Sequence, residues 1–331
     1  MIKMALFGCG RIGRLHAQNI AQNQGAKLVQ VYDVHQPSAD QLAILHNCES
    51  ASSVEAILTN PEIDAVLIGT STDTHADLIE ASAKAGKAIF CEKPIDLSLD
   101  RVKQCAATIA PYNVPVQIGF NRRFDPSHKS ARDAMAAGEI GVLHQVIITS
   151  RDPEMAPQSY LESSGGMFRD MTIHDFDLAR FMLGEEPIEI FASASALVAP
   201  SVCAAVGDID SAMIQMKTAS GKLCHINNSR QAVYGYDQRV ELFGSAGMLI
   251  SDNQRPHDLK RFSATQAGKS EPYQFFFLER YAEAFVAELN AFIDCISNNK
   301  PTEVGFQDGE KALALAEAAY QSLESGKSVH L

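Results

Sequence analysis

The chain has 331 residues, 46% of them hydrophobic and 21% charged, which is enough for two globular domains. A formal net charge of −12 makes nucleic acids and anionic membrane surfaces poor partners. Because the chain shows neither a membrane-length apolar stretch nor a signal-peptide pattern, and its seven cysteines form no C-x-x-C pair, we expect a cytoplasmic protein with reduced thiols.

The first 120 residues alternate short apolar runs with longer helical stretches. The expected strands are Ile2–Phe7, Lys27–Tyr32, Ala65–Ile68, Ala88–Cys91 and Pro115–Ile118. The expected helices are Ile12–Gln22, Gln36–Leu45, Ser53–Leu58, Thr74–Ala85 and Ser98–Ile109. Crossovers of this length predict an α/β fold with a doubly wound parallel sheet, which is a Rossmann domain over residues 1–120.

A glycine turn follows the first strand. The segment from Gly8 to Gly13 has the spacing G-x-G-x-x-G, and it includes Arg11 and Ile12 at the start of the next helix. Such glycines allow a tight turn, a close approach to a pyrophosphate and close packing of helix on strand. The pattern alone is weak, since glycine turns are common, but its place between a strand and a helix favours dinucleotide binding.

Asp33 ends the second strand, about twenty residues beyond Gly13. There its carboxylate can accept hydrogen bonds from the ribose hydroxyls of an adenosine, and it would repel a 2′-phosphate. No Arg or Lys follows it directly. The sequence therefore predicts NAD rather than NADP as the cofactor.

Two further segments leave the carboxyl ends of parallel strands, where open α/β sheets bind ligands. The first runs from Gly69 to His75 and contains Thr70, Ser71 and Thr72. The second reads Glu92-Lys93-Pro94 and directs Lys93 toward the cofactor crevice.

After Asn121 the pattern changes. A helix over Pro126–Ala137 is followed by strands at Leu143–Thr149, Glu189–Val198, Ser211–Met216, Lys222–Arg230, Gln238–Phe243 and Gly247–Ser251. Two helices, Glu279–Ser297 and Gln307–Glu324, close the chain. We therefore expect a second α+β domain over residues 121–331, with a large, mostly antiparallel open sheet.

Within this domain, residues 165–177 read GGMFRDMTIHDFD. We expect this stretch to open one helix, on which Asp170 and His174 stand four residues apart on one face. A carboxylate beside an imidazole favours the protonated ring, and such a pair can collect the proton that leaves an alcohol. The same spacing turns Asp175 away, and no second histidine lies at ligand spacing, so we assign no metal.

The E-K-P segment and the G-G-x-x-x-D-x-x-x-H segment together resemble the Gfo/Idh/MocA family, that of glucose–fructose oxidoreductase and inositol 2-dehydrogenase. The resemblance covers essentially the whole chain, often includes a cis proline after the lysine, and is strongest to the inositol dehydrogenase branch. It implies an NAD-dependent dehydrogenase acting on CH–OH groups, with a cyclic polyol such as inositol as substrate.

The resemblance also implies roles for individual residues. The catalytic set would be Lys93, Asp170 and His174. The cofactor contacts would be Gly8, Gly10, Arg11, Ile12, Gly13, Asp33, Thr70, Ser71, Thr72, His75, Glu92 and Lys93. The substrate contacts would be Lys93, Asn121, Arg122, Asp152, Asp170, His174, Tyr234 and Tyr236, with the two tyrosines on one face of an extended segment. Arg123 and Asp237 could serve the site or form structural ion pairs.

Three alternatives stay open at this point. The substrate could be glucose or another sugar, the chain could be a non-catalytic NAD-binding regulator, or it could be an NAD-dependent glycosidase. The preferred inositol isomer does not follow from the sequence. Relatives are commonly tetramers, and the broad sheet of the second domain would suit burial between subunits.

Overall fold

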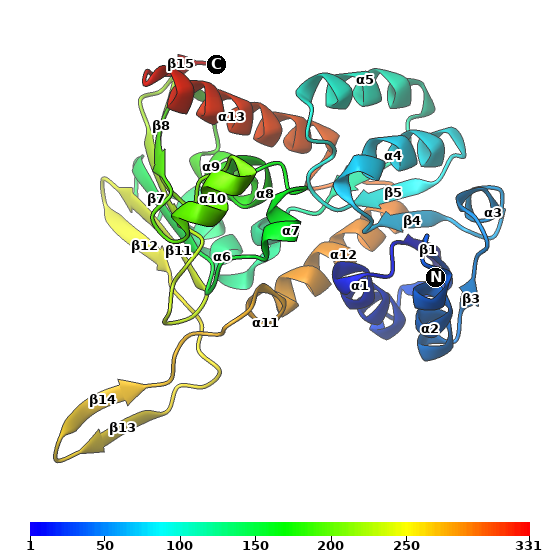
Figure 1. The fold of residues 1–331 in the computed structure, drawn as a ribbon, viewed down its shortest axis with the longest axis horizontal. Coiled ribbons are helices and arrows are strands. Elements are labelled where there is room, and N and C mark those ends of the chain that lie inside the picture. The colour runs from blue at the N-terminus through cyan, green and yellow to red at the C-terminus, as the bar shows by residue number, and fades with distance from the viewer. The chain divides into compact units, whose positions relative to one another are not determined.

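The computed structural model describes residues 1–331 and divides into two compact units (Figure 1). Unit 1 comprises Met1–Phe124 and Glu283–Leu313, and unit 2 comprises Asp125–Ala282 and Ala314–Leu331. A segment near the C-terminus therefore belongs to the same unit as the N-terminal strands. None of the helices combines the length and the apolar character that crossing a membrane requires.

Unit 1 is built on a six-stranded parallel sheet with the order β3-β2-β1-β4-β5-β6. Its strands are β1 (Ile2–Phe7), β2 (Ala26–Tyr32), β3 (Glu49–Ser50), β4 (Ala65–Ile68), β5 (Ala88–Cys91) and β6 (Val116–Ile118). The strand order reverses between β1 and β4, and open sheets of this type bind ligands at that point. The predicted Rossmann topology is confirmed.

Helices connect these strands. They are α1 (Arg11–Gln22), α2 (Gln36–His46), α3 (Val54–Leu58), α4 (His75–Lys84) and α5 (Leu99–Ile109), with the short 3-10 helices η1 (Thr72–Thr74), η2 (Ala110–Tyr112) and η3 (Asn121–Phe124). Ser53 and Ser98 cap α3 and α5 by accepting a backbone N–H, as serine commonly does at a helix start.

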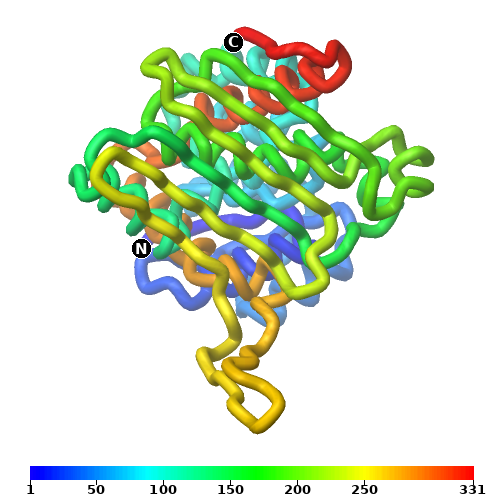
Figure 2. The backbone as a smooth tube through the Cα atoms, turned by 90° about the vertical axis from the view of Figure 1, so that its left-hand side faces the viewer, coloured from blue at the N-terminus to red at the C-terminus, as the bar shows by residue number.

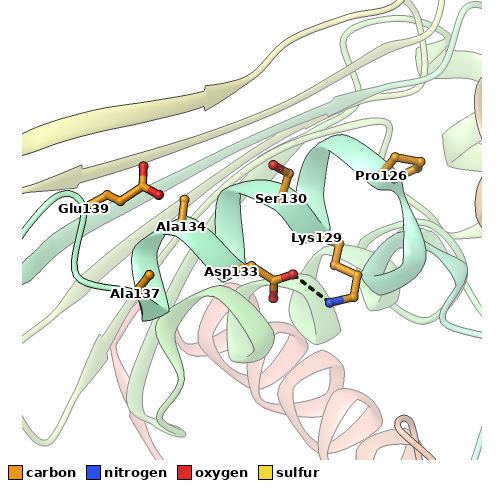
Figure 3. Close-up of a pocket in the computed structure, with 7 residues that line it drawn as sticks. All are labelled: Pro126, Lys129, Ser130, Asp133, Ala134, Ala137 and Glu139. Carbon is orange, nitrogen blue, oxygen red and sulfur yellow. Dashed lines mark hydrogen bonds and ion pairs between the residues drawn. The ribbon is translucent and has the colours of Figure 1, made fainter.

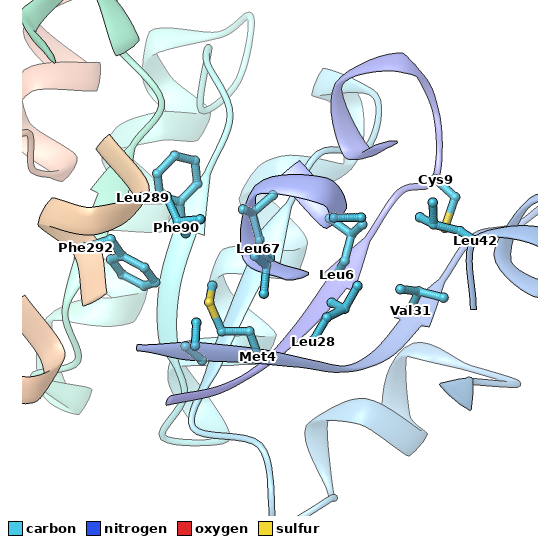
Figure 4. Packing of buried hydrophobic residues seen from close by; sticks show 14 of the residues in the cluster. Met4, Leu6, Cys9, Leu28, Val31, Leu42, Leu67, Phe90, Leu289 and Phe292 are labelled. Carbon is cyan, nitrogen blue, oxygen red and sulfur yellow. The ribbon is translucent and has the colours of Figure 1, made fainter. Parts of the chain in front are cut away.

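The core of unit 1 includes a helix from the far end of the chain (Figure 4). Helix α12 (Ala282–Asn298) places Leu289 and Phe292 in the same buried cluster as Leu67 and Phe90. The rings of Phe90 and Phe292 meet edge to face at 5.6 Å between centroids. Burial of apolar area at about 25 cal/mol per Å² makes this packing a main source of stability for the unit.

Unit 2 contains a seven-stranded sheet with the order β12-β11-β7-β10-β9-β8-β15, whose strands lie side by side in Figure 2. They are β7 (Leu143–Arg151), β8 (Pro187–Ser195), β9 (Ser211–Thr218), β10 (Leu223–Ser229), β11 (Asp237–Gly244), β12 (Gly247–Ser251) and β15 (Val329–His330). Only β7 and β10 pair in parallel. The expected large, mostly antiparallel sheet is confirmed.

The helices of unit 2 are α6 (Pro126–Ala136), α7 (Gln158–Leu161), α8 (Met167–Asp170), α9 (Thr172–Leu183), α10 (Pro200–Val206), α11 (Phe277–Arg280) and the end of α13 (Phe306–Ser325). A separate hairpin, β13 (Lys260–Ser263) with β14 (Gln266–Ser270), extends from the sheet. Sequence patterning missed this hairpin, α7, α10 and β15, and it merged α11 with α12. These elements are short, and their periodicity is too brief to register.

Candidate active site

The glycine turn between β1 and α1 leaves room for a ligand at one position only. Gly8 has a φ of +94°, and a Cβ there would lie 2.5 Å from the carbonyl oxygen of Gly69. A Cβ at Gly13 would lie 1.9 Å from the carbonyl oxygen of Gly8, whereas one at Gly10 would meet nothing within 4 Å. The turn's own packing therefore demands Gly8 and Gly13. Gly10 borders open space, and no side chain caps α1, so its first amides suit a phosphate.

Asp33 lies beside this turn. One of its carboxylate oxygens accepts a hydrogen bond from the backbone N–H of Cys9 at 2.7 Å, and the other accepts one from His35 at 2.8 Å. Each oxygen keeps a further lone pair. The carboxylate is thus fixed in orientation and still able to accept hydrogen bonds from ribose hydroxyls.

The turn after β4 carries three hydroxyl side chains. Thr70 and Thr72 are half-buried and Ser71 is exposed. The hydroxyl of Thr74 contacts that of Thr70 at 2.7 Å and the carbonyl oxygen of Ser71 at 2.8 Å, which fixes the shape of the turn. The turn is adjacent to Gly69, and thus to the glycine turn at the reversal of strand order.

His75, at the start of α4, is almost completely buried. Its Nδ1 lies 2.7 Å from the carbonyl oxygen of Pro94, and its Nε2 lies 3.2 Å from that of Thr70. Burial lowers the pKa of His75, and the ring lies between two loops of unit 1. Its predicted contact with the cofactor stays a prediction.

Lys93 is half-buried at the carboxyl end of β5, between two anchored neighbours. The peptide bond to Pro94 is cis, as the family resemblance implied. On the other side, Glu92 is buried, and its carboxylate lies 2.6 Å from Nε2 of His16 on α1. Glu92 thus contacts the interior of unit 1, and a contact between it and the cofactor stays a prediction.

Asp170 and His174 lie on two consecutive helices rather than on one. Helix α8 ends at Asp170 and α9 begins at Thr172, with Met171 between them. The amide of His174 donates to the carbonyl oxygen of Met171, three residues back, so the regular ladder is broken there. The expectation of one continuous helix is therefore wrong, although both residues lie in one short segment of unit 2.

Helix α9 is buried along nearly its whole length, and His174 is one of two residues that are only half-buried. Asp175 is completely buried and accepts a hydrogen bond at 2.9 Å from Asn228 of β10, which also accepts one from Thr172. These bonds hold α9 against the sheet. They also direct Asp175 toward β10.

Asp170 has two partners that sequence patterning missed. The hydroxyl of Tyr160 donates to one carboxylate oxygen at 2.7 Å, and Arg230 contacts the other at 3.3 Å. Arg230 is buried and also lies 3.6 Å from Asp208. Burial and the Asp170 charge raise the pKa of Tyr160, which keeps its proton for this hydrogen bond. Neither partner carries a local motif, and only the fold brings them to Asp170.

The 3-10 helix η3 directly follows β6 and buries both Asn121 and Arg122. Arg123 forms an ion pair with Asp308 of α13 at 2.8 Å, within unit 1. This contact favours the structural interpretation for Arg123. The substrate contacts predicted for Asn121 and Arg122 stay predictions.

Tyr234 and Tyr236 do not share a face, so that expectation is wrong. The hydroxyl of Tyr234 donates to Asp237 at 2.7 Å and accepts from Arg151 at 2.9 Å, and its ring is exposed. Tyr236 is buried edge to face against Tyr281. Between them Gly235 has a φ of +119°, which ends the alternation that an extended segment would have.

Asp237 and Asp152 both lie near the carboxyl end of β7, but their settings differ. Asp237 is buried and pairs with Arg239 at 2.8 Å and with Arg151 at 3.4 Å. Burial would raise the pKa of Asp237, but hydrogen bonds from Arg239, Tyr234 and Asn253 lower it. These contacts favour a structural role. Asp152 directly follows β7, and its backbone N–H donates to the carbonyl oxygen of Ser229. The negative charge of Asp152 contributes to raising the pKa of Arg230 and that of Tyr160.

A hollow of about 510 Å³ lies along α6 (Figure 3). Its lining residues are Pro126, Lys129, Ser130, Asp133, Ala134, Ala137 and Glu139. None of the predicted site residues lines it, and Lys129 and Asp133 form an ion pair along the helix. We assign it no function.

The predicted site residues form two groups. One group lies on the turns at the ends of β1, β4 and β5 in unit 1, and the other is the Asp170–His174 segment in unit 2.

Comparison with known proteins gives matches over both units. Residues 2–120 match the family model described as an oxidoreductase family with an NAD-binding Rossmann fold, and residues 128–250 match the GFO/IDH/MocA C-terminal domain. An inositol 2-dehydrogenase of Rhizobium meliloti (strain 1021) is 46% identical over 331 residues, covering 100% of this chain and 99% of that protein.

Solved structures agree with these matches. A myo-inositol dehydrogenase from Corynebacterium glutamicum superimposes with a TM-score of 0.97 at 41% identity, covering 100% of this chain and 99% of the other. A scyllo-inositol dehydrogenase from Lactobacillus casei, with bound NAD(H) and scyllo-inositol, gives a TM-score of 0.92 at 29% identity, with 100% and 99% covered. The similarity therefore extends over both units.

Proposed function

This chain belongs to the GFO/IDH/MocA oxidoreductase family, and we propose that it is an inositol 2-dehydrogenase that oxidises a ring hydroxyl of myo-inositol, or of a related isomer, to the ketone. Unit 1 carries the family's NAD-binding domain. The observation that carries the proposal is full-length similarity to inositol dehydrogenases in a chain whose glycine turn leaves space at Gly10 alone. Such an enzyme would begin the catabolism of inositol.

The two domains would have different functions. Residues 1–120 would bind NAD through the glycine turn, Asp33 and the turn at Thr70, with Arg11, Ile12, Ser71, Thr72, His75, Glu92 and Lys93 as further predicted contacts. Residues 121–331 would hold the polyol and form the contacts between subunits. When bound, NAD supplies the hydride acceptor, the C4 carbon of its nicotinamide ring.

In this proposal His174 accepts the proton of the reacting hydroxyl, because it is the ionisable group that α9 leaves accessible. Asp170 orients the ring of the substrate. Its carboxylate is fixed by Tyr160 and Arg230, and a fixed acceptor loses little freedom when a hydroxyl binds. Lys93 would donate a hydrogen bond to the same substrate oxygen and stabilise its alkoxide character.

A polyol presents many hydroxyls, and each one that is buried without a partner costs about 1–3 kcal/mol of affinity. We propose Asn121, Arg122, Asp152 and Tyr234 as further partners for them. Tyr236, buried against Tyr281, suits the wall of the site better than a hydrogen bond to substrate. This part of the proposal concerns specificity and not the chemical step.

The test is the appearance of NADH absorbance with myo-, scyllo- and chiro-inositol and with glucose, each assayed with NAD and with NADP. We expect turnover with NAD and at least one inositol. Preference for glucose would move the assignment to another sugar dehydrogenase. NAD binding without turnover of any polyol would point to a regulator, and NAD-dependent cleavage of a chromogenic glycoside would point to a glycosidase.

Replacing Asp33 with alanine should raise the KM for NAD about tenfold to a hundredfold, because a hydrogen bond to a charged group contributes about 1.5–3 kcal/mol. The KM for NADP should rise far less, since removing the carboxylate also removes its repulsion of the 2′-phosphate. The measurement is a pair of saturation curves. An equal rise for both cofactors would mean that the variant only loosens the turn at Cys9.

We further propose that the open face of the seven-stranded sheet joins subunits into a tetramer. Exposed apolar side chains from five of the seven strands share this face, as the cross-strand pairing shows. They are Phe191, Met213, Leu223, Phe243, Met248 and Ile250.

We also propose a cytoplasmic location. The chain has seven free cysteines, six of them buried, which suits a reducing compartment.

Met213→Glu should lower the molar mass measured by light scattering after size exclusion, because it places a charge on the face that the tetramer would bury between subunits. Ile44→Glu changes an exposed apolar residue on α2 of unit 1 and should leave the mass unchanged. A wild-type protein that elutes as a monomer at all concentrations would contradict this assembly.

A further inference from the structure

Three ionisable side chains meet in the interior of unit 1, and none of them is among the residues to which the proposed reaction gives a chemical role. They are His16 from α1, Glu92 from the end of β5, and Glu288 from α12. One ligating atom from each lies within 4.8 Å of the others, and Glu288 and His16 are both completely buried. Buried carboxyl groups of this kind are rare unless they are paired.

His16 and Glu92 form the firm contact of this cluster, at 2.6 Å between Nε2 and Oε1. The other ring nitrogen of His16 is buried without a hydrogen-bond partner, and the rings of Phe90 and Phe285 pack edge to face against it. A neutral ring with its proton on Nε2 satisfies the bond to Glu92 and leaves no N–H unpaired. Glu92 therefore carries the negative charge of the pair.

Glu288 cannot carry a second charge at low cost. Neither of its carboxylate oxygens has a hydrogen-bond partner, and Gln117 binds only its backbone carbonyl oxygen. Burial and the nearby charge of Glu92 raise the pKa of Glu288 well above its ordinary value. The titratable groups around it are Glu92 and His16, and the charge of Glu92 also acts on Cys91 and His75.

The cluster bears directly on Lys93, the next residue along the chain. Glu92 is buried and bonded to His16, whereas Lys93 beside it is half-buried, so the anchoring of Glu92 limits where Lys93 can lie. The bond to His16 also ties this segment to α1, the helix that begins at the glycine turn. His75 holds the following residue, Pro94, from the other side.

We propose that Glu288 is protonated in a buried cluster with His16 and Glu92, and that the bond between His16 and Glu92 fixes the segment bearing Lys93, which makes His16 a positioning residue for the reaction. The inference rests on the proposed function for its catalytic consequence, but not for the protonation of Glu288. A proton suits the site better than a metal ion, because the short contact between His16 and Glu92 is already that of a hydrogen bond.

The first experiment needs no substrate. Urea unfolding is measured from about pH 5 to about pH 9 for wild type and for Glu288→Gln. The control is Glu283→Gln, on the exposed first turn of the same helix. A carboxyl whose pKa is raised by folding contributes stability that is lost as pH rises above its unfolded pKa. The unfolding constant of wild type relative to Glu288→Gln should therefore rise about tenfold per pH unit, until Glu288 ionises in the folded state.

Parallel pH dependences for wild type and Glu288→Gln would overturn the proposal. A stoichiometric divalent metal that is present in the purified wild type and absent from Glu288→Gln would also overturn it, in favour of a metal site. Glu283→Gln should follow wild type throughout. These outcomes hold whether or not the chain oxidises inositol.

The second experiment tests positioning through kinetics. His16→Leu should lower kcat about tenfold to a hundredfold, since small displacements of a reacting group cost rates of this order, while the Kd for NAD changes less than about twofold. His16→Gln keeps a donor near the Nε2 position and should recover most of kcat. Equal losses in both variants, or a loss confined to NAD binding, would remove the positioning role. Absence of turnover in wild type would instead refute the proposed function.

Discussion

Replacing His174 with alanine should lower kcat with inositol by about 10²–10⁴-fold, the range that a general base contributes. The Kd for NAD should not change, because His174 lies in unit 2 and the glycine turn lies in unit 1. The ring is one of the two side chains of α9 that are not fully buried, so its removal should leave the packing of the helix against β10 intact. Steady-state kinetics and NAD titration measure both quantities.

The matched control is His257→Ala, which removes an exposed imidazole from the segment between β12 and β13 of the same unit. It should keep wild-type turnover. Retention of near-wild-type kcat by His174→Ala would remove His174 from the proposed role. A decrease in kcat together with a lower midpoint of thermal unfolding would show that His174→Ala acts on the structure. The control variant should change neither quantity.

Local sequence patterns predicted the parts of the fold that depend on neighbouring residues. The glycine spacing, the apolar runs and the position of Asp33 each lie within a few dozen residues of one another, and strands β1, β4 and β5 have the expected bounds. The path of α12 was not predictable in this way. Its apolar face identifies a packed helix, but periodicity does not say which sheet it packs against.

The site was predicted less completely, because its supporting contacts join distant segments. Arg230 reaches Asp170 across 60 residues, and Arg123 reaches Asp308 across 185. Nothing near Arg230 in the sequence distinguishes it from a solvated arginine. The prediction for Tyr234 and Tyr236 failed for a different reason. Strand-like alternation predicted that they share a face, but the positive φ of Gly235 between them turns Tyr236 to another side.

Replacing Lys93 with methionine should lower kcat with inositol by about 10²–10³-fold, the loss that follows removal of one donor to a developing oxyanion. Methionine keeps most of the length and apolar volume of the lysine stem, so the change isolates the ammonium group. Lys93→Arg keeps the charge but spreads it over a planar fork, and it should recover only part of the rate. Lys84→Met, at the exposed end of α4, is the control and should behave as wild type.

The double variant Lys93→Met with His174→Ala decides whether the two side chains act on one oxygen. Residues that act as a unit have non-additive effects, so the double variant should be little slower than the slower single one. Losses that multiply would mean that Lys93 and His174 act independently. Since the two residues belong to different units, a shared effect would be direct evidence that one substrate binds to both.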